Sequence, residues 1–292
     1  MANHLLFRSK KLPFLTFIRA LVLGCCTLLS TVTQAYCIDN WACFDVVKRA
    51  QNIEFWLSNK KPFPITATLE VKGRNLSSSS GTHDIYSETR VLAGEQRLLV
   101  LTLSATDPDY PTGYNDEFYW TPGILDARHD NGYRYALPYA QGAHYRLVQG
   151  FDGRYSHSGA SRFALDYAMP VGTPVHAARE GKVIDIQAKH NRGGASRHYS
   201  RYANFITILH NDGTTGEYYH LKQNGVAVAL GAKISRGQLI GYSGNTGFSS
   251  LPHLHFAVYQ AKSYGKYASI KIKFSHALRH PTGSTLTTGK HP

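Results

Sequence analysis

The sequence has no long helical pattern. After the first 35 residues, apolar side chains nowhere recur at helical spacing over a long stretch, and no segment repeats at a fixed period. A helical bundle and a repeat architecture are therefore disfavoured. Aromatic residues make up 12% of the chain and glycine contributes 26 residues, a composition that is typical of strands and turns. We predict a mainly β fold.

Cysteine is also scarce. The chain has four cysteines, and two of them, Cys25 and Cys26, lie in an N-terminal segment that we expect to be removed. The remaining pair, Cys37 and Cys43, is too small for a disulfide scaffold, so a hydrophobic core must hold the fold. In an oxidising compartment we expect this pair to form a local disulfide that pins the mature N-terminus.

The first 35 residues have the order of a secretory signal peptide. A basic region without acidic residues precedes an apolar run over 20–32, which is too short to cross a membrane comfortably, and the segment ends in Ala35. We predict cleavage after Ala35 and export to the periplasm or the exterior. Two alternatives stay open, lipidation at Cys25 and an uncleaved anchor, and either would associate the protein with a membrane. The basic residues are Arg8, Lys10, Lys11 and Arg19.

Positive charge dominates the chain. Lys and Arg number 32 against 19 Asp and Glu, for a net charge of +13, and removal of the four basic residues of the signal peptide leaves +9. Such a surface suits an anionic partner, which could be nucleic acid, acidic lipid or an acidic cell wall. Composition alone does not choose among these partners, but export argues against nucleic acid.

Turn residues divide the rest of the chain into two β-rich parts. Residues 36–136 contain loosely alternating segments and predict a small all-β domain, in which His83 and His129 are interpreted as isolated surface residues. Residues 137–274 contain short strands with glycine turns, including expected hairpins over 173–187 and 204–221. The tail, residues 275–292, is expected to be mobile.

Histidine is abundant, with 15 residues, and its placement is informative. The sharpest cluster is His253-Leu254-His255, which enters an apolar strand expected over 254–260. Side chains two apart on a strand point to the same face, so both histidines can reach one metal site. Two buried imidazoles at this position require a partner.

Two further pieces of sequence supply such partners. His157 lies nine residues before Asp166, and Asp166 interrupts an apolar strand, which is costly unless the carboxylate binds a cation or hydrogen-bond donors. His220 ends the second expected hairpin. Taken singly, Asp166 and His220 also fit structural hydrogen-bonding roles. Two imidazoles and one carboxylate, with a position left for water, form the layout of a catalytic zinc site.

Together these residues resemble the M23 (lysostaphin-like) peptidase family strongly. The family order is a His and Asp pair, a later Tyr-x-His and then a His-x-His before an apolar strand, with glycine-rich segments between them. The resemblance covers roughly residues 138–274. The matching residues are His157, Asp166, Tyr218-Tyr219-His220, His253-Leu254-His255 and the segments 170–175, 181–183 and 241–247.

The resemblance implies a C-terminal antiparallel β-sheet metallopeptidase domain that cuts peptide bonds in bacterial peptidoglycan. It implies zinc ligation by His157, Asp166 and His255. His220 and His253 would then be unligated catalytic histidines that polarise water or stabilise the oxyanion. The sequence departs from many members in one respect, because these place the first His and Asp four residues apart.

Two other functions stay open. A non-catalytic member of the same fold would bind or activate a cell-wall amidase, but such proteins characteristically lack ligand or catalytic histidines, and this chain keeps all five positions. A basic module that binds nucleic acid or polysaccharide would explain the charge and leave the His/Asp set without a role. His176 and His210 are interpreted as structural, and the basic segment 189–201 as a solvated loop that could alternatively rim the cleft.

Overall fold

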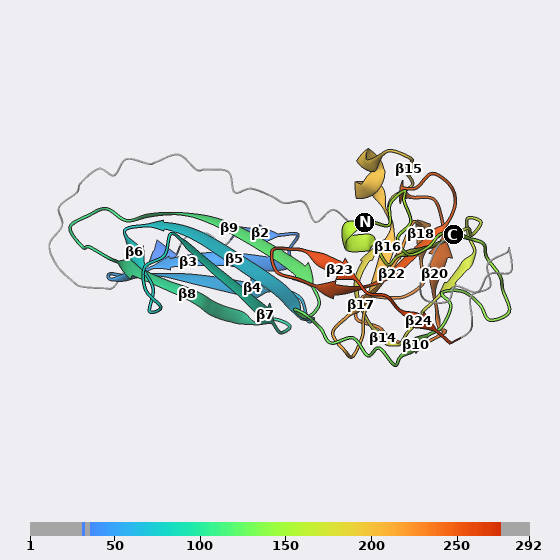
Figure 1. Cartoon of the computed structure of the whole chain (residues 1–292), viewed down its shortest axis with the longest axis horizontal. Helices are drawn as coiled ribbons and strands as arrows, with labels where there is room; N and C mark the ends of the chain where they lie inside the picture. The colour runs from blue at the N-terminus through green and yellow to red at the C-terminus, as the bar shows by residue number, and fades with distance from the viewer. Residues whose placement is uncertain (1–30, 33–35, 276–292) are drawn as a thin grey trace. The chain divides into compact units, whose positions relative to one another are not determined.

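The computed structural model of the protein describes residues 31–32 and 36–275, which form two compact units (Figure 1). Apart from two 3-10 helices, η1 (Gly159–Ser161) and η2 (Arg197–Tyr202), all regular elements in this part of the chain are strands, which confirms the mainly β fold. None of its helices is long and apolar enough to span a membrane. Most of the predicted signal peptide and the tail beyond Ser275 lie outside the described residues.

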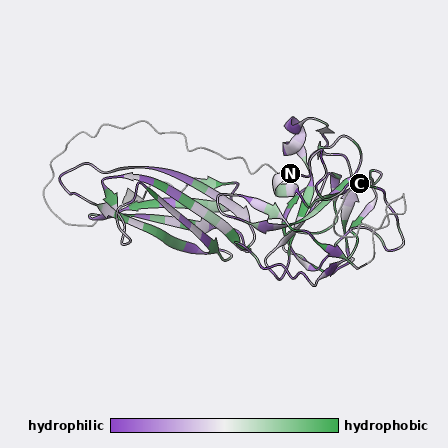
Figure 2. Ribbon diagram, viewed as in Figure 1, coloured by the Kyte–Doolittle hydropathy of each residue, from purple (hydrophilic) through white to green (hydrophobic). Residues whose placement is uncertain are grey.

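The N-terminal unit ends at Trp120 and includes residues 263–265. Ring stacking joins its two sheets, with centroids 5.0 Å apart for Trp41 and Trp120 and 6.2 Å apart for Phe44 and Phe118, so the sheets pack face to face. Hydrophobic and hydrophilic bands cross these strands (Figure 2). One sheet contains β1 (Thr31–Val32), β2 (Tyr36–Ile38), β3 (Ala42–Lys48), β4 (Asn52–Asn59), β8 (Arg97–Ala105) and β6 (Leu76–Ser77), and the other contains β7 (Ile85–Leu92), β5 (Ile65–Arg74) and β9 (Gly113–Pro122).

A disulfide joins Cys37 and Cys43, which are also cross-strand partners of β2 and β3. It closes the first hairpin of the N-terminal unit, next to the fully buried Ala42. A local cross-link of this kind restricts only a short stretch of the unfolded chain. The fold of the unit therefore rests on the core between its sheets.

The division between the units falls between Trp120 and Thr121, earlier than the boundary expected at 136/137. The residues in between belong with the C-terminal unit by their contacts. Tyr135 is fully buried in the core of that unit, and Leu125 forms a β-bridge with Ala261. The turn-rich sequence of residues 121–136 therefore gives no sign that they pack against the core of the C-terminal unit.

The C-terminal unit is built on an eight-stranded sheet, accompanied by a three-stranded sheet and two short parallel pairs. The large sheet contains β11 (Leu147–Gln149), β12 (Leu165–Tyr167), β22 (Leu254–Ala261), β17 (Thr215–Tyr219), β16 (Phe205–Leu209), β14 (Gly181–Gln187) and β19 (Lys233–Ile234), with β23 (Tyr267–Ser269) beside β22. The small sheet contains β13 (Pro174–His176), β20 (Leu239–Ser243) and β18 (Leu221–Val226), and the pairs are β10 (Arg134–Tyr135) with β24 (Lys273–Phe274) and β15 (Gly193–Gly194) with β21 (Gly247–Phe248).

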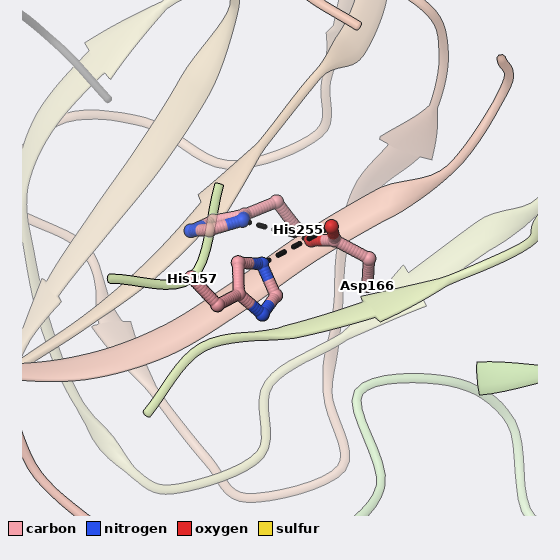
Figure 3. Close-up of side chains that lie close together, drawn as sticks. All are labelled: His157, Asp166 and His255. Atoms are coloured by element: carbon pink, nitrogen blue, oxygen red, sulfur yellow. Dashed lines mark hydrogen bonds and ion pairs between the residues drawn. The ribbon is translucent and has the colours of Figure 1, made fainter. Parts of the chain in front are cut away.

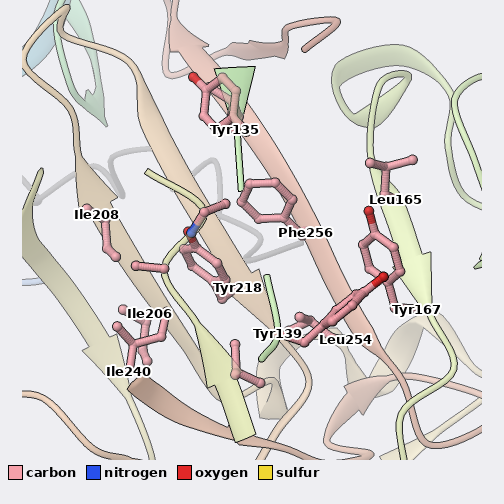
Figure 4. Close-up of a cluster of buried hydrophobic side chains, with 14 of the residues drawn as sticks. Tyr135, Tyr139, Leu165, Tyr167, Ile206, Ile208, Tyr218, Ile240, Leu254 and Phe256 are labelled. Carbon is pink, nitrogen blue, oxygen red and sulfur yellow. The ribbon is translucent and has the colours of Figure 1, made fainter. Parts of the chain in front are cut away.

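The core of this unit lies on one face of the large sheet (Figure 4). On β22, Leu254 and Phe256 point into the core and are fully buried. Because side chains alternate along a strand, His255 and Ala257 point to the opposite face. The same alternation on β12 and β17 places Asp166 and Tyr219 on that opposite face, since both are cross-strand partners of His255. The candidate site is built there.

The expected hairpin over 204–221 is confirmed, because β16 and β17 pair from Phe205↔Tyr219 to Leu209↔Thr215. The expected hairpin over 173–187 is wrong, since β13 pairs with β20 whereas β14 pairs with β16 and β19. Gly181 is not a turn residue but lies at a close approach between two strands. A Cβ atom at this position would lie 2.3 Å from the Leu209 carbonyl oxygen, so glycine is needed where β14 approaches β16.

Candidate metal centre and active-site cleft

Three potential metal ligands converge on the site face of the large sheet. Asp166 on β12 is the cross-strand partner of His255 on β22, and His157 lies in the loop before η1. His157 Nε2 is 3.1 Å from Asp166 Oδ2, and His255 Nδ1 is 2.9 Å from Asp166 Oδ1 (Figure 3). All three residues are buried, and one ligand atom from each lies within 4.8 Å of the others. The sequence-predicted ligand set is therefore brought together in space.

The donor atoms are oriented in a way that fits a divalent cation. The His157 Nδ1–H group donates to the Gly150 carbonyl oxygen at 2.8 Å, which directs Nε2 towards the carboxylate. His157 Nε2 is buried and forms no hydrogen bond. A buried acceptor nitrogen without a partner is costly, and a metal ion between it, Asp166 and His255 would remove that cost. Two imidazoles and one carboxylate are a donor set that zinc accepts.

The electrostatics of Asp166 and His255 favour their ligating forms. Burial alone would raise the pKa of Asp166, but its contacts with His157 and His255 outweigh burial and hold this pKa well below the usual range. Burial lowers the pKa of His255 to about 4. An ionised carboxylate and a neutral imidazole are the forms that bind a metal without first releasing a proton.

His220 and His253 form a second group of imidazoles beside the three ligands. Their ring centroids are 4.5 Å apart, and His253 Nε2 lies 3.8 Å from Asp166 Oδ1. The Nδ1–H group of His220 donates to the Thr246 carbonyl oxygen at 2.7 Å, and His253 Nδ1 lies 2.8 Å from the Leu251 carbonyl oxygen. Both Nε2 atoms therefore stay available for a substrate or a water molecule.

His220 has an unusual backbone conformation. Its φ of 67° is in the left-handed region, and a residue other than glycine adopts this backbone conformation at a cost of about 1 kcal/mol or more. Burial and the nearby His253 lower the pKa of His220 well below its ordinary value, so its imidazole is neutral at pH 7. A strained residue with a shifted pKa is typical of a functional site.

These groups open onto one cleft. Asp166, His220, His253 and His255 line it, while His157 is covered. The walls come from segments that are distant in sequence, which is common for a substrate-binding site. They are formed by Val148, Gln149, Tyr155, Ser156, Phe248, Ser249, Ser250 and Leu251.

Gln149 is a site residue that sequence analysis did not identify. Its Nε2 group donates to Asp166 Oδ2 at 3.0 Å and to Ser156 Oγ at 2.7 Å, while its Oε1 accepts from the backbone N–H groups of Tyr155 and Ser156. Gly153 leaves room for this side chain, since a Cβ there would lie 2.2 Å from Gln149 Cγ. Gln149 thus ties the loop that carries His157 to the carboxylate. The glycines around it are a signal in the sequence, although a weak one.

Replacing Gln149 with leucine is expected to weaken zinc binding about 10- to 100-fold, because groups that orient a metal ligand typically contribute that much. Leucine has a similar size but cannot hold the Asp166 carboxylate. Competition with a chelator measures the affinity. Gln223→Leu is the matched control, because Gln223 is exposed and donates only to the Lys189 carbonyl oxygen. Unchanged affinity in Gln149→Leu would show that the carboxylate needs no such donor.

The other histidines in the described ranges do not join the site. The His176 Nδ1–H group donates to the Gly237 carbonyl oxygen at 2.8 Å, and His83 forms a T-shaped ring contact with Tyr86. His129 is not isolated, since its Nε2 lies 3.1 Å from the Tyr135 hydroxyl. His210 is 2% exposed, its Nδ1–H donates to the Glu180 carbonyl oxygen, and its Nε2 has no hydrogen-bond partner. A structural role for His176 and His210 remains our interpretation.

We expect His210 to make the protein less stable as the pH falls from about 6.5 to about 4. Burial lowers the pKa of His210 from 6.5 to about 4. Between these pH values His210 is protonated in the unfolded chain but stays neutral in the folded protein, so acidification favours unfolding. At about 1.4 kcal/mol per pKa unit, the unfolding free energy would fall by up to about 3 kcal/mol. Urea unfolding of wild type and His210→Gln between pH 7.5 and 4.5 checks this. The variant should lose less stability with acidification, and parallel pH curves would contradict the prediction.

A site with two imidazoles, a carboxylate and a second histidine pair in a cleft defines a class of metal-dependent hydrolases. Comparison with known families agrees with that class. Residues 160–267 match the model of Peptidase family M23, a range that contains Asp166, His220, His253 and His255 and begins just after His157. The family resemblance drawn from the sequence is thereby confirmed over these residues.

Individual relatives match segments of similar length. The peptidoglycan DD-endopeptidase ShyA of Vibrio cholerae is 36% identical over 116 residues, which are 38% of this chain and 24% of that protein. The glycyl-glycine endopeptidase ALE-1 of Staphylococcus capitis is 38% identical over 100 residues, 34% of this chain and 25% of that protein. The solved structure of lysostaphin from Staphylococcus simulans is similar with a TM-score of 0.32 and 29% identity, covering 45% of this chain and 50% of that one. The matched segment spans about a quarter of the length of these curated relatives.

Proposed function

We propose that the C-terminal unit is a zinc endopeptidase that hydrolyses peptide bonds in peptidoglycan stems or cross-links. The observation that carries this proposal is the convergence of two groups in one cleft, the ligand set around Asp166 and the pair His220 and His253. The names of relatives support the substrate class, since one is a peptidoglycan DD-endopeptidase and another a glycyl-glycine endopeptidase. These two names differ in the bond, so the bond cut by this chain stays open.

In this proposal His157, Asp166 and His255 hold the zinc ion. Bound zinc would supply Lewis acidity and lower the pKa of a water molecule at its open position. His220 is neutral, because burial lowers its pKa, and it can accept a proton through Nε2. Between them, His220 and His253 would take a proton from the attacking water and donate hydrogen bonds to the carbonyl oxygen as it gains charge. The carbonyl groups of Thr246 and Leu251 keep both rings in place.

The proposed compartment follows from the sequence and the charge. The net charge of +9 that remains after removal of the predicted signal peptide favours an anionic wall polymer, and the signal peptide would bring the enzyme to it. We propose an exported protein of the periplasm or the exterior, which an uncleaved or lipidated N-terminus would anchor to the envelope. The proposed hydrolysis of peptidoglycan does not depend on whether the N-terminus is cleaved, because an enzyme anchored to the envelope meets the same wall.

Digestion of purified peptidoglycan tests the proposed function. The protein alone should release soluble fragments, and mass spectrometry should find new peptide termini within stems or cross-links. A non-catalytic domain that activates an amidase would release nothing alone and would act only when an amidase is added. This alternative is less favoured because all five functional positions are filled. Absence of new peptide termini would contradict the hydrolase.

A further inference from the structure

One wall of the cleft carries an aromatic pair that the proposed chemistry does not use. Tyr155 and Phe248 both line the cleft, with ring centroids 5.6 Å apart and ring planes 22° apart. Tyr155 is 59% exposed, which is high for a large aromatic side chain next to a buried metal centre. Its hydroxyl donates to the Ala195 carbonyl oxygen at 3.4 Å, so the pair also contacts the loop that precedes η2.

That loop is basic and is attached to the cleft. Residues 188–203 contain four cationic side chains and no carboxylate: Lys189, Arg192, Arg197 and Arg201. Its strand β15 pairs with β21, so that Gly194 is the partner of Phe248, and the Ser249 N–H donates to the Gly194 carbonyl oxygen at 3.0 Å. The segment that the sequence left open as either a solvated loop or a rim is therefore attached to the wall of the cleft through Gly194.

Arg197 is the cation of this loop that reaches the aromatic pair. Its guanidinium carbon lies 5.4 Å from the centroid of Phe248, and within the described part of the chain no carboxylate forms an ion pair with it. Arg192 and Arg201 contact Tyr202 instead, at 5.5 and 5.1 Å. Packing on an aromatic ring fixes the plane of a guanidinium while leaving its N–H groups free to donate.

We infer that Tyr155, Phe248 and Arg197 form a subsite that binds a free carboxylate group of the peptide substrate next to the bond that is cut. A guanidinium held beside a cleft matches a carboxylate with paired hydrogen bonds. Within the described residues, the side chains that line the cleft include no lysine or arginine, so Arg197, which packs on the cleft-lining Phe248, is the cation placed to select for charge. An aromatic pair alone would also suit a sugar ring, but the guanidinium without an acidic partner favours an anion. This inference rests on the proposed function, because it concerns the same cleft.

The subsite is tested with two synthetic peptides of the same sequence. One has a free side-chain carboxylate or α-carboxylate beside the scissile bond, and in the other that group is amidated. Wild type should cleave the acidic peptide with a kcat/KM about three- to tenfold higher than that of the amidated peptide, and the difference should lie in KM rather than in kcat. High salt should reduce this preference. Arg197→Gln should remove this preference, so that the ratio of kcat/KM for the two peptides falls to about one. Arg201→Gln is the matched control, since it removes the same charge from the same loop away from the cleft and should keep the preference.

Binding of both peptides to His220→Ala, followed by fluorescence anisotropy, separates the subsite from the reaction. A preference for the acidic peptide that depends on Arg197 would support the subsite even if hydrolysis were absent, in which case only the proposed function would fail. Equal treatment of the two peptides by wild type, or equal losses on both in Arg197→Gln, would overturn the inference. It would also be overturned if Arg197→Gln weakened binding of a peptide-free glycan fragment and spared both peptides, which would assign the aromatic pair to sugar.

Discussion

The substitution His255→Ala is expected to empty the metal site and abolish hydrolysis. His255 is buried on β22 and would supply one of three protein ligands, and a zinc site with two remaining ligands loses its tetrahedral geometry. The change also removes the contact of Nδ1 with Asp166 at 2.9 Å, which leaves the carboxylate buried with fewer partners. Elemental analysis of the purified variant should find far less than one zinc per chain.

His176→Ala is the control for this experiment, because His176 lies on β13 outside the candidate site and its ring donates a hydrogen bond to the Gly237 carbonyl oxygen. It should keep both zinc and activity. Circular dichroism of His255→Ala would establish that the fold persists without the metal. Stoichiometric zinc with normal turnover in His255→Ala would show that the ligand assignment is wrong.

The substitutions His220→Ala and His253→Ala are each expected to keep zinc and to lower kcat about 10²- to 10⁴-fold, the usual contribution of a general acid or base. Neither ring belongs to the ligand set, although His253 Nε2 comes within 3.8 Å of Asp166. His220→Ala also removes the hydrogen bond to the Thr246 carbonyl oxygen, so a loss of thermal stability should accompany the loss of activity. Zinc analysis and single-turnover hydrolysis of the same preparations measure both properties. If either change releases the metal, that histidine is a ligand and the roles must be exchanged.

Much of the candidate site was predictable because its chemistry is concentrated in short motifs. The spacing of His253 and His255 around an apolar strand predicts that both rings reach one site, and both line the cleft. Asp166 stands out in the sequence because a carboxylate within an apolar strand needs a cation or donors. The nine residues between His157 and Asp166 are accommodated because His157 precedes η1 in a loop, while Asp166 is paired on a strand.

Other features could not be predicted because they depend on contacts between distant segments. Gln149 has no local pattern, and its role comes from the pairing of β11 with β12, which places it beside Asp166. The pairing of β13 with β20 was missed for a similar reason, since Gly181 is as typical of a hairpin turn as of a close strand approach. The contact of Arg197 with Phe248 depends on the pairing of β15 with β21, two segments of two residues each.

The central claim, that one zinc ion held by His157, Asp166 and His255 drives hydrolysis of peptidoglycan peptides, is tested most directly by a metal titration. Protein stripped of metal is mixed with increasing zinc, and the release of new peptide termini from purified peptidoglycan is measured at each step. The account predicts negligible release without zinc and a rise that saturates at one equivalent per chain. Full activity of the metal-free protein, or no hydrolysis with one zinc bound, would contradict it.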